Sequence, residues 1–149
     1  MLDRKNPVDG QEGHKKMQVK TPILQAKDVM RRNVVAIDGM ATVREAIAKI
    51  RSENVTALIV NKRDPSDAWG IVTVPDLVRE VIAPGRPPDD TNVYEIMTKP
   101  VITVPPDMDI RYVARLLYRV RVRRAPVEAQ GELLGMISLS DLVLRKGVL

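Results

Sequence analysis

Hydrophobic and polar positions alternate in the same order twice along this chain. Short β-branched runs at residues 34–37 and 101–104 predict strands. After each run, apolar residues follow at the i, i+3, i+4, i+7 spacing of a helix with one buried face: Val43, Ala46, Ile47 and Ile50, then Ile110, Val113, Ala114 and Leu117. Thr42 with Glu45 is a capping-box pattern at the start of the first helix, and Asp109 can cap the second.

Two further strands and a short helix complete each copy. Residues 57–60 and 125–127 predict second strands, 70–73 and 134–138 predict third strands, and short helices follow from Val74 and Leu139. Pro126 has no N–H, so its strand should lie at an edge or pair on one side there. Each copy is strand–helix–strand–strand–helix, which is too small to bury both faces of its sheet alone. We therefore expect the two copies to pack against each other.

The repeat also includes polar residues. Residues 70–78 read Gly-Ile-Val-Thr-Val-Pro-Asp-Leu-Val, and residues 135–143 read Gly-Met-Ile-Ser-Leu-Ser-Asp-Leu-Val. A repeat that serves packing alone does not need the shared hydroxyl and aspartate, so these residues are candidate ligand contacts. The same hydroxyl-x-x-Asp spacing is also that of a helix cap followed by a favourable first-turn carboxylate. Local physics leaves both roles open, and they are compatible.

The bounds of the two repeats predict the domain organisation of the chain. We predict an α+β fold with a flexible tail at 1–22, one repeat at 23–82, a linker at 83–92 and a second repeat at 93–149. The linker is rich in proline and glycine, which suits a stiff spacer between paired halves.

Composition excludes several function classes. The chain of 149 residues has 44% hydrophobic residues and no cysteine, so it has no disulfides and no thiol nucleophile. No run approaches the ~20 apolar residues of a membrane helix, and the N-terminus lacks the apolar stretch of a signal peptide. No metal-ligand cluster, P-loop or Ser–His pair is present, and the single histidine lies in the predicted tail. The sequence predicts a cytoplasmic protein, not inserted in a membrane, with no catalytic or metal site.

The charge favours an anionic partner. The formal net charge is +5, the pI is about 9.7, and residues 119–124 hold a dense arginine run. A phosphorylated metabolite, nucleic acid and a merely solvated basic face all fit this charge. One tryptophan and three tyrosines offer little stacking surface, which weighs against nucleic acid.

Two copies of this element order, each ending in Gly-apolar-apolar-Thr/Ser-x-x-Asp-Leu, resemble the tandem CBS domain pair, or Bateman module. Residues 123–127, Arg-Arg-Ala-Pro-Val, are similar to the family's Arg-x-Pro-Val strand. The resemblance implies β-α-β-β-α repeats packed with pseudo-twofold symmetry, and two clefts between them. Such clefts bind adenosyl ligands such as AMP, ADP, ATP or S-adenosylmethionine. It also implies regulation of a partner enzyme or transporter, frequently by a homodimer.

The resemblance also implies residue roles. Asp76 and Asp141 would accept hydrogen bonds from ribose hydroxyls, a task that suits a carboxylate. Thr73 and Ser138 would face phosphate, Arg123 and Arg124 would supply charge to it, and the segments Val34–Val35 and Val101–Ile102 would flank adenine. Because successive side chains of a strand face opposite ways, we expect at most one of the two arginines in a given cleft, preferably Arg124.

The two clefts are not expected to be equivalent. Where the second repeat has Arg123 and Arg124, the first has Thr56 and Ala57. The cleft of Asp141 should therefore bind phosphate-bearing ligands better than the cleft of Asp76. The leading hypothesis is a stand-alone regulatory module for an adenosyl ligand, with AMP as first candidate and no obligatory cofactor. The alternative is a basic nucleic-acid-binding protein that uses the pair as a scaffold.

Overall fold

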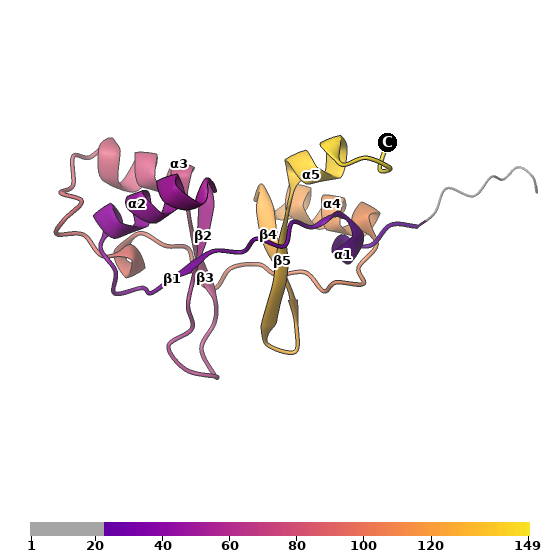
Figure 1. Ribbon diagram of the computed structural model, residues 1–149, viewed down its shortest axis with the longest axis horizontal. Coiled ribbons are helices and arrows are strands. Elements are labelled where there is room, and N and C mark those ends of the chain that lie inside the picture. The colour runs from indigo at the N-terminus through magenta and orange to yellow at the C-terminus, as the bar shows by residue number, and fades with distance from the viewer. Residues whose placement is uncertain (1–22) are drawn as a thin grey trace, which may run out of the picture.

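The computed structural model describes residues 23–149 and places the two repeats side by side (Figure 1). The predicted tail, residues 1–22, lies outside the described residues. The elements of the first repeat are β1 (Ala36–Ile37), α2 (Val43–Glu53), β2 (Ala57–Val60), β3 (Gly70–Thr73), α3 (Val74–Leu77) and the π-helix η2 (Val78–Ile82). Those of the second are α4 (Ile110–Val120), β4 (Arg124–Ala129), β5 (Glu132–Ser138) and α5 (Leu139–Leu144). The predicted α+β class and the two repeats are confirmed.

The strands of the two repeats pair in matching registers. In the first repeat β1 runs parallel to β2, and β2 runs antiparallel to β3. In the second, β4 runs antiparallel to β5. Ala57 lies opposite Thr73 in one sheet, and Arg124 lies opposite Ser138 in the other. Both helix starts are capped as predicted, by Thr42 with Glu45 and by Asp109.

The predicted strand at 101–104 is reduced to a single bridge, between Val104 and Val127. In the first repeat, the Ile59 N–H donates to the Val35 carbonyl at 2.9 Å and helps to hold the chain leading into β1. Pro126 occupies the position of Ile59, and because it has no N–H it cannot make the equivalent bond to Ile102. The predicted strand at 34–37 is also shorter than expected and covers only β1.

The sequence did not predict that each repeat lends its leading segment to the other. Helix α1 (Ala26–Val29) packs in the core of the second repeat, against residues such as Leu117. The 3-10 helix η3 (Val93–Glu95) packs in the core of the first. Two matched bridges fix this exchange, Gln25 with Asp109 and Thr42 with Asn92. The bridges are related by the repeat, so the exchange is symmetric.

A third apolar cluster joins the repeats. Buried Ala57, Ile59 and Ile71 pack with partly buried residues from both repeats: Val34, Trp69, Val101, Leu133 and Met136. The Trp69 indole N–H also donates to Glu128 of the second repeat at 3.2 Å. The expected packing of one copy against the other is thereby confirmed.

Candidate functional site: a basic cleft between the repeats

Both hydroxyl-x-x-Asp patterns form capping boxes. Ser138 is the N-cap of α5, and its hydroxyl accepts from the Asp141 N–H at 3.1 Å. Asp141 Oδ2 in turn accepts from the Ser138 N–H at 3.0 Å and from its hydroxyl at 2.9 Å. Thr73 and Asp76 make the same three bonds at the start of α3. The capping role is confirmed in both repeats, and it leaves Oδ1 of each aspartate for another partner.

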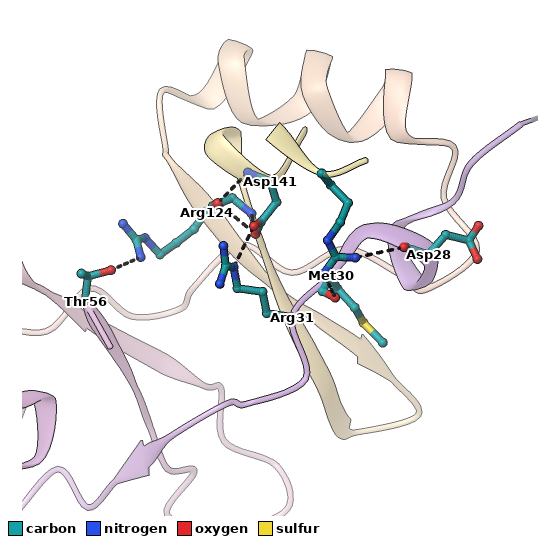
Figure 2. Close-up of polar contacts among 8 residues, drawn as sticks. Asp28, Met30, Arg31, Thr56, Arg124 and Asp141 are labelled. Carbon is teal, nitrogen blue, oxygen red and sulfur yellow. Dashed lines mark hydrogen bonds and ion pairs between the residues drawn. The ribbon is translucent and has the colours of Figure 1, made fainter. Parts of the chain in front are cut away.

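That partner differs between the repeats. Arg31 Nε donates to Asp141 Oδ1 at 2.8 Å, and Figure 2 shows the two side chains meeting from separate segments of the chain. Arg79, one helical turn after Asp76, donates to Asp76 Oδ1 at 2.5 Å. Both aspartates are buried, with 4% and 6% exposure for Asp141 and Asp76. Asp141 is thus tied to the other end of the chain, whereas Asp76 is held within its own helical segment.

A cavity of about 630 Å³ opens beside Asp141, between the two repeats. It gathers six of the predicted site residues: Val34, Val35, Arg123, Arg124, Ser138 and Asp141. The first repeat contributes the segment before β1 and the turn between α2 and β2, which includes Thr56. The second contributes the start of β4 and of α5. Arg31 also lines the cavity, so three arginines and one aspartate line the same space.

Arg124 is a cation of the cleft whose donors are only partly satisfied. Its Nη1 donates to Thr56 Oγ1 of the other repeat at 2.7 Å (Figure 2), but its buried Nε has no hydrogen-bond partner among the described residues. The pKa of Arg124 is lowered, mainly because the side chain is buried and secondly because Arg123 carries a like charge nearby. The negative charge of Asp141 raises the pKa and offsets part of this effect. Since a buried unpaired donor is costly, an anion in the cleft would be stabilised here.

Arg123 lines the same cavity as Arg124. It lies in the bend before β4, which begins at Arg124, so the alternation of side chains along a strand does not extend to it. That at most one of the two side chains faces the cleft stays a prediction.

The other four predicted residues, Thr73, Asp76, Val101 and Ile102, line neither of the two cavities described for residues 23–149. Thr98, Thr56 and Ala57 occupy the positions that correspond to Arg31, Arg123 and Arg124. The space beside Asp76 therefore lacks all three of these cations, and Arg79 already neutralises the carboxylate.

Sequence reasoning missed Arg31 because it belongs to the exchanged segment. Aligning the repeats shows that Arg31 corresponds to Thr98, which lies on the side of Asp76. The residues around Arg31 in the sequence give no signal that its side chain lies beside Asp141. The same segment is held by Arg145, just after α5, which donates to the Asp28 and Met30 carbonyls at 3.3 and 3.1 Å. Figure 2 shows Asp28 and Met30 on the same segment of the chain as Arg31.

A larger cavity, of about 740 Å³, lies on the first repeat, where Asp38, Met40, Lys62, Tyr94 and Lys99 are among its lining residues. It contains none of the predicted site residues. Among residues 23–149 no cluster of His, Cys, Asp or Glu suited to a metal ion is found. Nor does any helix in this range have the length and apolarity to cross a bilayer.

The family model described as "CBS domain" matches residues 26–83 and 93–146. The chain belongs to the CBS domain family. The CBS domain-containing protein CBSX3, mitochondrial, of Arabidopsis thaliana is 33% identical to it over 126 residues, and the match covers 78% of this chain and 61% of that protein. The chain spans about three fifths of the length of this and another curated relative.

Solved CBS structures have the same fold. The hexameric CBS-CP12 protein from bloom-forming cyanobacteria superposes with a TM-score of 0.81 at 45% identity, over 83% of this chain and 68% of that one. The CBS domain pair of protein MJ0100, solved with 5′-methylthioadenosine and S-adenosyl-L-methionine, superposes with a TM-score of 0.71 at 22% identity, over 81% and 94% of the two chains. At that identity the second likeness concerns the fold alone.

Proposed function

We propose that this CBS domain pair is a non-catalytic, cytoplasmic regulatory module that binds an adenine nucleotide or related adenosyl ligand in the cleft of Asp141. The observation that carries the proposal is the buried Nε of Arg124, which has no hydrogen-bond partner within residues 23–149, beside a cavity that Asp141 also lines. A ligand with an anionic end and vicinal hydroxyls matches both groups. The MJ0100 pair was solved with adenosyl ligands, which supports the adenosyl class.

In this proposal the ribose hydroxyls donate to Asp141, and Arg123 and Arg124 hold the phosphate. Val34 and Val35 flank the base, and Ser138 keeps Asp141 in place through the capping box rather than contacting phosphate itself. AMP is the first candidate because one phosphate suffices for the two arginines. Thr73, Asp76, Val101 and Ile102 would form a second, weaker site with less attraction for charge.

Calorimetric titration tests the proposal. We expect AMP, ADP, ATP or S-adenosylmethionine to bind wild-type protein, and Asp141→Asn to abolish or strongly weaken the binding. Asp76→Asn is the matched control, since it alters the same capping box in the other repeat. A ligand at 100 times its Kd should stabilise the fold by about 2.7 kcal/mol, visible as a rise in Tm. No response to any of these ligands would overturn the proposal.

A regulatory module must also transmit occupancy. A ligand shifts an equilibrium only if it binds two arrangements with different affinity, so the partner protein or a second copy must distinguish them. Exposed apolar side chains on η2 and α5 support a homodimer through these helices: Val78, Ile82 and Val143 are 52%, 65% and 58% exposed. We propose a homodimer that modulates a partner enzyme or transporter. Sedimentation of Val78→Glu and Val143→Glu tests the dimer, which each charge should dissociate.

A further inference from the structure

The net positive charge of the chain comes from one short segment. Residues 109–124 contain six arginines and one aspartate, a net charge of +5. The remaining residues contain eighteen basic and eighteen acidic side chains, so they are formally neutral. The segment comprises the N-cap of α4, α4 itself, the turn after it and the first residue of β4. Two of its six arginines, Arg123 and Arg124, line the nucleotide cleft, and the other four belong to α4 and the residue that ends it.

The arginines of α4 share one exposed face. Arg111, Arg115 and Arg119 are spaced by four residues, which places them above one another on the helix surface, about 6 Å apart along its axis. All three are exposed, as are the neighbouring Tyr112 and Tyr118 at 56% and 83%. The Arg115 guanidinium lies 5.3 Å from the centre of the Tyr112 ring.

Most of this charge is not neutralised locally. Arg111 pairs with Asp109 at 2.6 Å, but Arg115, Arg119 and Arg121 form no ion pair with an acidic side chain among residues 23–149. Long-range attraction of an anionic partner is the physical consequence of such a cluster.

The first repeat has uncharged residues at three of these positions. Ala48, Ser52 and Asn54 correspond to Arg115, Arg119 and Arg121, and α2 and α4 have the same length. Asn54 and Arg121 both have a left-handed backbone conformation, with φ of 57° and 60°. Asparagine tolerates that conformation better than arginine does, so the second repeat holds a cation where the backbone disfavours it.

We propose that this surface, the arginine face (Arg111, Tyr112, Arg115, Tyr118, Arg119 and Arg121), binds single-stranded nucleic acid. Every cation in it is arginine, whose planar fork matches phosphate oxygens. Stacking surface is scarce in the chain as a whole, but two of its three tyrosines are exposed on this one face. They favour nucleic acid over an acidic protein segment, because unpaired bases stack on aromatic rings and carboxylates do not. The face is distinct from the nucleotide cleft, since none of its residues lines that cavity.

Fluorescence anisotropy with a labelled single-stranded 20-nucleotide probe of mixed sequence tests the proposal. We expect binding that weakens steeply between 50 and 200 mM salt. The variant Arg115→Ala, Arg119→Ser, Arg121→Asn carries the first repeat's own residues, which this fold accepts at these positions. Its Kd should rise at least tenfold, and the slope of log K against log salt should fall by about 2. Arg119→Gln alone should cause a smaller loss of affinity for the probe, and it keeps the test valid if the triple variant misfolds.

A charge-matched control removes three cations from α2, by Arg44→Gln, Lys49→Gln and Arg51→Gln. It should change Kd by less than threefold. Tyr118→Ala should weaken binding about fivefold or more. Wild type that fails to bind at 50 mM salt, or a control that loses as much as the triple variant, would overturn the proposal. So would equal binding of a polyglutamate peptide, which would identify an acidic protein partner instead.

Discussion

Arg31 Nε lies 2.8 Å from Asp141 Oδ1, although 110 residues separate them in the sequence. The ion pair joins the segment that leaves α1 to the first turn of α5, across the edge of the cleft. Asp141 Oδ2 already accepts two hydrogen bonds from Ser138, so Oδ1 is the oxygen to which a ribose hydroxyl would donate. Arg31 donates to this same Oδ1. Arg31 therefore competes with the hydroxyl of a ligand while attracting its phosphate.

The first prediction separates these two effects. Arg31→Gln should weaken AMP binding about tenfold, which corresponds to ~1.4 kcal/mol, because a cation is lost from the cleft. Adenosine, which has the same ribose and no phosphate, should bind as well as before or better, because Asp141 is released. Calorimetric titration of both ligands measures the split.

The neighbouring residue provides the control for this prediction. Arg32→Gln makes the same charge change at an exposed position that lines neither cavity. It should leave both affinities within about twofold of wild type, a change below ~0.5 kcal/mol. If Arg31→Gln weakens adenosine and AMP equally, Arg31 acts through the shape of the cleft and not through its charge.

The second prediction concerns the two glycines that begin the repeated pattern. A Cβ at Gly135 would lie 2.5 Å from the Arg31 carbonyl oxygen and 2.6 Å from Met30 Sδ. A Cβ at Gly70 would meet Met97 Sδ at 3.0 Å and the Thr98 carbonyl at 3.3 Å, where smaller shifts suffice. Gly135→Ala should cost about 2–3 kcal/mol and Gly70→Ala about 1 kcal/mol. Urea denaturation measures the free energy of unfolding of both variants. Equal destabilisation by the two substitutions would contradict the prediction.

The sequence predicted what depends on local pattern. The helical spacing of Val43 to Ile50, the second strands at 57–60 and 125–127, and the hydroxyl-x-x-Asp boxes are determined within a few residues, and the structure reproduces them. The effect of Pro126 was predicted only in part. Its missing N–H implied pairing on one side, but not that the strand at 101–104 would shrink to one bridge.

The exchange of α1 and η3 lay beyond such reasoning. A helix as short as α1 leaves a weak periodic signal, and its apolar residues fit either core equally well by composition. Which repeat they join is decided by bridges between distant segments, such as Gln25 with Asp109. Arg31 was missed in the cleft for the same reason. Ser138 and Arg124 were assigned to the cleft by the resemblance to the family, which rests on motifs contained within one strand or one helix start.

The third prediction is a pH dependence in the loop before β3. Hydrogen bonds from Arg63, then from Lys99, hold the pKa of Asp67 far below its usual range. A carboxylate whose pKa is lowered on folding stabilises the protein above its unfolded pKa, about 3.9, and that contribution is lost as the pH falls below this value. Asp67→Asn should therefore lower Tm most at pH 7, and the difference should shrink progressively as the pH falls from 4 to 2.

Melting curves of wild type and variant between pH 2 and pH 7 test the sign. The exposed Asp107, changed to Asn, serves as the control and should produce a small difference with no such trend. A difference between wild type and Asp67→Asn that stays constant across this range would show that the Asp67 charge does not stabilise the loop.

The fourth prediction tests the backbone argument for the arginine face. Arg121 is left-handed at the end of α4, where asparagine is tolerated better, so Arg121→Asn should stabilise the fold by about 1 kcal/mol. This corresponds to a rise in Tm of about 2–4 °C. Arg119→Asn removes the same charge within the helix, where asparagine costs about 0.5 kcal/mol, and should lower Tm. Opposite signs at the two positions are expected in thermal melts. A rise in both would instead attribute the gain to relief of repulsion among the arginines, and the backbone argument would fail.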